Sequence, residues 1–236
     1  MENAGNDNAS NRERVTDDTI QFQKPLSARE RRERARAEMA SAILEAARIV
    51  MRRDGVAALN LNEVARMVGI QTPGLYKYFA GKMGIYDALF QRAIEVYRPR
   101  LEQVWAEYPP GWQRLEAWLE ARMRFAQDHP DLDRLFLSRD VPGFVPSADS
   151  MEKSGCFLGA ALQAFMESLA ACGLAPDVDP GRARGLFFAT MQGLTLMHLA
   201  NEPDQPVGSG FYGSLIPDAI ATFRRAWTDP EEGGDA

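Results

Sequence analysis

The sequence predicts an all-α protein, in which an N-terminal three-helix unit is joined to a larger C-terminal helical bundle. Three observations predict this class. Apolar side chains recur at three- and four-residue steps along the long segments after residue 27. Capping residues, glycines and prolines separate these segments. No run of residues has the two-residue alternation of a β-strand, and no repeat occurs at a fixed spacing.

Composition favours a globular protein without a membrane span. The chain has 236 residues, of which 45% are hydrophobic and 25% charged. Its longest apolar stretch, 186–200, is interrupted by Gln192 and His198 and is shorter than the roughly 20 residues that a membrane span needs. The only two cysteines, Cys156 and Cys172, have no neighbours at metal-ligand spacing. We therefore expect a cytoplasmic protein with no cofactor, no metal and no membrane partner.

Charge is distributed unevenly along the chain, whose net charge is −6. Residues 27–98 carry thirteen basic and eight acidic side chains, a net charge of +5. Residues 99–236 carry eleven basic and twenty acidic side chains, a net charge of −9. A basic segment followed by an acidic one fits a nucleic-acid-binding unit attached to a body that stays away from nucleic acid. An ordinary solvated helix surface also accounts for a charge of +5.

The first helix is expected over 27–54. Ser27 and Glu30 have the spacing of a capping box, and Gly55 can adopt the positive φ that ends a helix. Residues 1–26 and 229–236 are polar and are expected to be disordered tails. The domain boundaries that follow are 27–82 for the three-helix unit and 83–228 for the bundle.

Residues 58–82 have the pattern of two short helices joined by a tight turn. Asn60 and Glu63 again have capping-box spacing, which predicts that Glu63 returns to the free N–H of the cap. Gly69 can take the positive φ of the turn. Thr72 and Pro73 then begin a second helix. A helix pair joined by a glycine-containing turn is typical of a helix-turn-helix, whose second helix enters the DNA major groove.

The side chains that the second helix leaves exposed suit DNA. Tyrosine and lysine donate hydrogen bonds to phosphates, whereas threonine, glutamine and lysine can reach base edges. With the cap and a lysine that follows, the predicted DNA-binding set is Asn60, Gln71, Thr72, Gly74, Tyr76, Lys77, Tyr78 and Lys82.

This segment closely resembles the DNA-binding domain of the TetR family of transcriptional regulators. The resemblance covers about residues 36–90 and is most specific in 64–82, with Val64-Ala65, Val68-Gly69-Ile70, Leu75-Tyr76-Lys77-Tyr78-Phe79 and Lys82. It implies that Tyr76, Lys82 and the cap Asn60 hold phosphates. It implies that Thr72, Lys77 and Tyr78 work in or beside the groove.

Two positions depart from the family pattern. Gln71 and Gly74 stand where the family usually has Ser or Thr. Gly74 has no side chain to offer a base, whereas Gln71 can reach an adenine edge. The alternative for the whole segment is three packed helices of a larger bundle, with the tyrosines at its rim.

A run of arginines from Arg29 to Arg36 has two interpretations. It is either an extension that follows the DNA backbone or enters the minor groove, or a solvated helix in which Glu30, Glu33 and Glu38 pair with the arginines. The interleaved glutamates slightly favour the second.

The later helices are expected over six ranges. These ranges are 82–107 with a kink or break at Pro99, 112–128, 132–139, 150–172, 180–201 and 214–228, with a loop at 208–213. The resemblance implies that they form a ligand-binding and dimerisation domain. The stretch from Phe125 to Phe136 and the later Gln192-Gly193-Leu194 loosely resemble the C-terminal subgroup named for a Trp-His-Gly pattern.

Two of these helices are the candidates for a homodimer interface. Helix 180–201 is apolar nearly all round, and helix 214–228 has Ile216, Ile220, Phe223 and Trp227 on one face. Two such helices from each subunit form a four-helix interface with two-fold symmetry. The alternative is that both belong to the core of a monomer.

A small-molecule site is expected in the bundle, but its ligand is not indicated. The candidate ligand residues are Arg122, Phe125, Phe136, Phe165, Phe188, Gln192 and His198. Each also fits an ordinary core or interface position. No phosphate loop, nucleophile elbow or HExxH motif occurs, so an enzyme is not expected.

The sequence therefore predicts a homodimeric repressor that binds double-stranded operator DNA and is released by a small ligand. The alternatives are an activator of the same fold and a helical ligand-binding or adaptor protein with a vestigial helix-turn-helix. The adaptor should lack the groove-facing Tyr76, Lys77 and Lys82, which are present.

Overall fold

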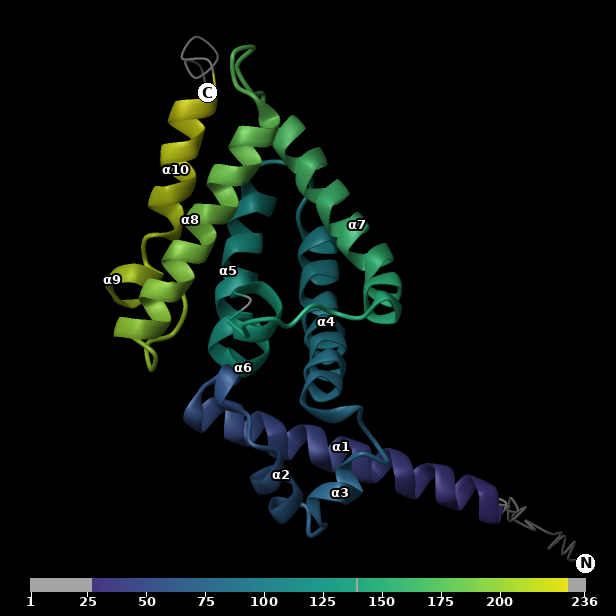
Figure 1. Ribbon diagram of the computed structural model, residues 1–236. Coiled ribbons are helices and arrows are strands. Elements are labelled where there is room, and N and C mark those ends of the chain that lie inside the picture. Colours follow the sequence, from purple (N-terminus) through teal and green to yellow (C-terminus); the bar gives the residue numbers. More distant parts are fainter. Residues whose placement is uncertain (1–26, 139, 229–236) are drawn as a thin grey trace, which may run out of the picture.

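The computed structural model describes residues 27–138 and 140–228 and is built of helices in two parts (Figure 1). Helices α1, α2 and α3 form a small unit below a larger body, and α4 leads from one to the other. The helices are α1 (Ala28–Asp54), α2 (Leu61–Met67), α3 (Thr72–Leu75), α4 (Gly81–Glu107), α5 (Trp112–Asp128), α6 (Pro130–Asp133), α7 (Ala148–Ala170), α8 (Pro180–Asn201), α9 (Gly210–Gly213) and α10 (Ile216–Trp227). The all-α class is confirmed.

Helix α1 begins and ends as the sequence predicts, but its two halves differ. The Ser27 capping box is present, and Gly55 ends the helix with a φ of 92°. Residues 28–38 are exposed, and in Figure 1 this end projects away from the rest of the molecule. The second half is buried through Ile43, Ala47 and Val50, which pack in the common core. The predicted tails, 1–26 and 229–236, lie outside the described residues.

The body is a bundle around α4 and α5. Helix α4 contacts α5 and α7, and α5 also contacts α8 and α10. Its core is rich in aromatic rings, including the neighbouring Trp118, Phe165 and Phe187. Of the kink or break expected at Pro99, the break does not occur: α4 runs unbroken from Gly81 to Glu107 with Pro99 inside it. Within the described ranges, no helix is both long and apolar enough to cross a membrane.

Two predicted segments differ in local structure. The helix expected over 132–139 begins earlier, as α6 at Pro130, and continues as a π-helical turn, η2 (Arg134–Ser138). Pro130 suits the first helical turn because its missing N–H has no partner there in any case. The loop expected over 208–213 contains the short helix α9, stabilised where the Glu202 carboxylate accepts the N–H groups of Phe211 and Tyr212.

Helix α10 packs its apolar face against its own chain. Its apolar face, formed by Ile216, Ile220, Phe223 and Trp227, is buried within the chain. Phe223 stacks on Trp227 with ring centroids 4.4 Å apart, and Trp227 lies beside Trp112 of α5. A helical moment alone does not distinguish a face buried in its own subunit from one buried by a partner.

Candidate nucleic-acid interface and ligand cavity

The turn between α2 and α3 has the geometry of a helix-turn-helix. Gly69 has a φ of 72°, and the next N–H, of Ile70, donates to the Ala65 carbonyl at 3.0 Å. Val64 and Leu75 are buried beneath the turn, with exposed fractions of 0% and 2%. This local core holds α3 against α2 and leaves its other face free.

The cap of α2 forms differently from the prediction. The Asn60 side chain accepts the N–H groups of Asn62 and Glu63, as a cap should. The Glu63 carboxylate does not return to Asn60; it accepts two hydrogen bonds from Arg53 of α1, at 2.8 and 2.9 Å. These bonds lower the pKa of Glu63. Arg53 offers a charged, bidentate partner, which a single backbone N–H cannot match.

The outer surface formed by α3 and the residues that flank it presents hydroxyl, amide and ammonium groups. Gln71, Tyr76 and Lys77 are exposed, and Tyr76 has an exposed fraction of 62%. Thr72 and Tyr78 are half-buried, and the Thr72 hydroxyl donates to the Asn62 side chain at 2.8 Å. Three of the predicted DNA contacts are therefore exposed and free to meet DNA, and Thr72 is oriented by its hydrogen bond to α2.

Gly74 leaves a gap on this face that packing does not require. A Cβ at this position would lie 3.6 Å from the Ile70 side chain, an ordinary van der Waals distance. The absence of a side chain at Gly74 is therefore not forced from inside the protein.

The predicted phosphate-binding lysine is directed toward its own chain. The Lys82 ammonium donates to the Ala57 carbonyl at 2.8 Å and lies 5.7 Å from the centre of the Tyr86 ring. Tyr86 in turn donates to the Val56 carbonyl at 2.5 Å, and burial raises its pKa to about 12. One of three ammonium hydrogens is used, so the group retains donors for a phosphate.

Arg36 of α1 joins the α3 surface and was absent from the predicted site. Its guanidinium donates to the Lys77 carbonyl at 2.8 Å and lies 5.6 Å from the centre of the Tyr78 ring. The arginine-rich run signalled basic character, but its spacing did not indicate that one member reaches α3, 41 residues away.

A cavity of about 430 Å³ lies in the body between α4, α5, α7, α8 and η2. Four of the predicted ligand residues line it: Arg122, Phe136, Phe188 and Gln192. The other three do not. Phe125 packs against Tyr97, and Phe165 packs against Phe187. His198 is fully buried near Glu202, at the far end of α8.

One end of this cavity is polar and the rest is apolar. Arg122 is fully buried and pairs with Asp133 at 2.5 Å. It also donates to the Gln192 side-chain oxygen at 2.9 Å, and the Gln192 amide donates to the Ser138 hydroxyl at 2.9 Å. Burial raises the pKa of Asp133 to about 6, because its effect is larger than the lowering effect of the neighbouring Arg122 charge.

A second cavity adjoins the first. It measures about 400 Å³ and is lined by apolar side chains, including Phe90, Val141 and Phe144. Phe136, Leu137 and Leu158 line both cavities, so the two are separated by shared side chains.

Helix α6 links the body to α1 through a buried carboxylate. Asp131, exposed by 1%, accepts from Arg48 at 2.7 Å and from Arg52 at 3.0 Å. Arg48 also lies 3.3 Å from the His129 ring nitrogen, and burial followed by the Arg48 charge lowers the pKa of His129. Asp131 thus faces the three-helix unit, whereas Asp133, two residues on, pairs with the cavity residue Arg122.

The helix-turn-helix is the segment of the chain that matches a known protein family. Residues 43–89 match the family model described as bacterial regulatory proteins of the tetR family. This segment therefore has the sequence of a tetR-family DNA-binding domain. The match lies within the range 36–90 over which the sequence resembles TetR regulators, and it includes all eight predicted DNA contacts.

Relatives and solved structures agree with this assignment. The chain is 23% identical over 113 residues to the HTH-type transcriptional regulator RutR of Escherichia coli K12, covering 48% of this chain and 53% of RutR. It is 30% identical over 105 residues to the HTH-type transcriptional activator FasR of Mycolicibacterium smegmatis, covering 44% of this chain and 48% of FasR. The chain thus spans about half the length of these relatives.

The fold extends further than the sequence similarity. The transcriptional regulator FadR of Bacillus subtilis, solved in complex with stearoyl-CoA, is similar with a TM-score of 0.57 at 16% identity. The similarity covers 78% of this chain and 96% of FadR. This likeness includes the helical body and is one of fold.

Proposed function

We propose that this TetR-family chain is a homodimeric transcriptional regulator that binds operator DNA through α3 and acts in the cytoplasm. The observation that carries the proposal is the exposed polar surface around α3, where Gln71, Tyr76 and Lys77 flank the helix while its Leu75 is buried. A vestigial helix-turn-helix would have no reason to keep these side chains at the surface. The work of the protein is recognition rather than catalysis.

DNA binding is tested by a gel shift on the DNA upstream of the chain's own gene, across a salt series. We expect a specific complex whose binding constant falls steeply with salt, because bound phosphates release counterions. A scrambled duplex of the same length should bind at least about 10³-fold more weakly. Equal binding to both duplexes would contradict specific recognition.

The dimer is proposed to form chiefly through one face of α8. This face is exposed and apolar, and small residues in it allow a second helix to approach closely. Its members are Gly185, Leu186, Ala189, Gly193, Leu196, Met197 and Ala200. Leu186, Leu196 and Met197 have exposed fractions of 53%, 43% and 43%. A matching stripe from a second copy would cover them, and a two-fold dimer would bring two α3 helices to two half-sites.

The ligand is proposed to occupy the cavity beside Arg122. Its walls are mostly aromatic and aliphatic, whereas Arg122, Gln192 and Ser138 gather at one side. An amphipathic molecule with an apolar body and one hydrogen-bonding group fits this arrangement. FadR, which shares the fold, was solved in complex with stearoyl-CoA, a molecule with a long apolar part.

Ligand and DNA are proposed to act against each other through α6. The ligand would touch Arg122, which pairs with Asp133, and the same short helix holds α1 through Asp131. A displacement of α6 would therefore move α1 and the attached α3. Because coupling between two binding sites is reciprocal, operator DNA would weaken ligand binding by the same factor. Release on ligand binding corresponds to a repressor.

A further inference from the structure

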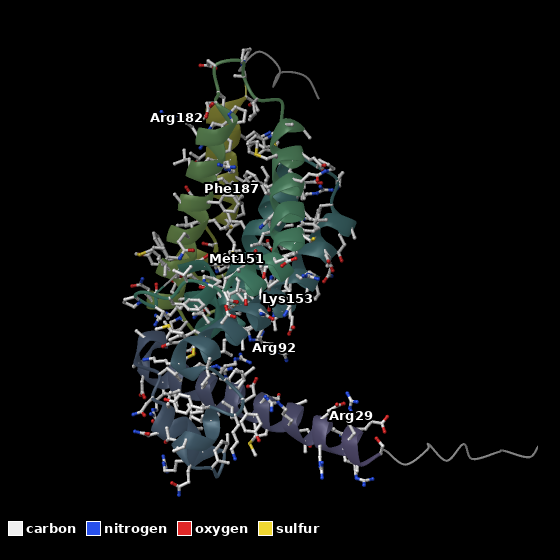
Figure 2. The ribbon with its side chains drawn as sticks, turned by 45° about the vertical axis from the view of Figure 1, so that its right-hand side comes forward. Arg29, Arg92, Met151, Lys153, Arg182 and Phe187 are labelled. Carbon is white, nitrogen blue, oxygen red and sulfur yellow. The ribbon has the colours of Figure 1, made fainter. Side chains whose placement is uncertain are left out.

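The first three turns of α1 form a helical arm that carries charge but no large apolar side chain. We define the arm as residues 28–38; all of them are exposed. It contains five arginines and three glutamates, and its only apolar side chains are Ala28, Ala35 and Ala37. In Figure 2 the arm, labelled at Arg29, points away from the body. Such a surface offers nothing to bury against another protein, but it can meet an anionic partner.

Ion pairs neutralise part of the arm and leave one side basic. Arg29 pairs with Glu33, and Arg34 pairs with Glu38, both at 2.8 Å. Arg32 has no ion-pair partner among residues 27–138 and 140–228. Its charge therefore remains available for a partner from outside the chain.

The basic side of the arm is continuous with α3. Arg36 contacts the Lys77 carbonyl and the Tyr78 ring, so this side of α1 faces the end of α3. Arg32 lies four residues earlier, one turn farther out on the same face. Arg34 lies about 200° around the helix from both, given 3.6 residues per turn. The line Lys77, Arg36, Arg32 thus extends the recognition surface outward along the arm.

We propose that the arm is a second DNA-binding element, in which Arg32 and Arg36 bind backbone phosphates of the operator outside the segment read by α3. The proposal rests on the DNA binding proposed above. Helical rise places the two arginines about 6 Å apart along the arm, so they extend the contact without reading bases. The chemistry recognised is a row of phosphate groups on duplex DNA.

The test compares two variants that each remove one arginine from the same exposed arm. The probe is a duplex recovered by selection from random-sequence DNA with the full chain. Arg32→Ala should weaken binding about 3- to 10-fold at 150 mM salt and lower the slope of log K against log salt by about one. Arg34→Ala, on the far side, should change binding less than 2-fold and leave the slope unchanged. Circular dichroism of both variants reports whether the arm stays helical.

Duplex length separates a flanking contact from general attraction. On a duplex trimmed to the segment read by α3, Arg32→Ala and the parent chain should bind alike. Equal losses for Arg32→Ala and Arg34→Ala on the long duplex would overturn the proposal, as would an Arg32-dependent affinity for phosphatidylserine vesicles without one for DNA. If the parent chain selected no duplex at all, the failure would lie in the proposed function.

Discussion

The two parts of the molecule use polar side chains in opposite ways. On the α2 and α3 side of the three-helix unit, polar groups are exposed and several pair with near neighbours, as Thr72 does with Asn62 and Asn60 with its own helix. In the body, polar groups are buried and pair over long stretches of chain, as Arg122 does with Gln192. Exposed groups can exchange water for DNA at little cost, whereas buried groups hold one arrangement and are disturbed by whatever enters beside them. This contrast fits the proposed division between a unit that recognises DNA and a body that responds to a ligand.

The largest expected effect is at the buried carboxylate that joins the two parts. Asp131→Ala leaves Arg48 nearly buried and without its main partner, which should lower the free energy of unfolding by about 3–5 kcal/mol. Urea unfolding measures it.

Asp128→Ala is the matched control, because Asp128 also pairs with an arginine but is half exposed. The free energy of unfolding should fall by less than about 1 kcal/mol. Equal losses of unfolding free energy in the two variants would show that the contact between α1 and α6 stabilises the chain no more than an exposed ion pair does.

The second prediction concerns the cavity carboxylate and its pH dependence. The folded-state pKa of Asp133, about 6, lies above its ordinary value of 3.8, so the folded chain keeps a proton that the unfolded chain releases. The stability contributed by Asp133 should therefore fall as pH rises from about 4 to 6, by about 1–3 kcal/mol. Urea unfolding of the parent chain and of Asp133→Asn over pH 4–7 isolates this change as their difference. If the parent chain instead gained stability relative to Asp133→Asn as the pH rose, the pKa of Asp133 would be lowered in the folded chain.

The third prediction separates the two lysines of the DNA surface. Lys77→Ala removes an exposed donor that directly follows α3. It should alter sequence preference, with a loss of about 1–3 kcal/mol of discrimination at the base that Lys77 contacts. Lys82→Ala should weaken binding to every sequence alike and lower the salt slope by about one. Competition gel shifts with single-base operator variants measure both. A changed preference in Lys82→Ala would reverse the assigned roles.

The smallest expected effects distinguish a glycine that a turn requires from one that it does not. Gly69→Ala forces a side chain to a φ of 72° and should destabilise the chain by about 1 kcal/mol. Gly155→Ala lies within α7 with open space around its Cβ and should stabilise it by about 0.5–1 kcal/mol. Thermal unfolding of both variants checks the opposite signs. If Gly69→Ala did not lower the unfolding temperature, a side chain at this turn would cause no strain.

The same contrast explains what the sequence could predict. The capping box at Ser27, the turn at Gly69 and the cap at Asn60 depend on residues within a few positions of one another, so their spacing predicts them. Arg48 meets Asp131 across 83 residues, and no periodicity signals such a pair. For the same reason, the prediction from sequence included Phe125, Phe165 and His198 among the ligand residues, although they do not line the cavity. Burial of the α10 face required the packing of α5.

The measurement that tests the account most directly is selection of random-sequence DNA with the intact chain, repeated with Lys77→Ala. The account predicts a palindromic motif whose half-sites lie about one helical turn apart, because two copies of α3 read successive major grooves. It also predicts that Lys77→Ala changes the same base position in both half-sites. No enriched motif, or an identical motif from both proteins, would contradict the claim that α3 reads DNA.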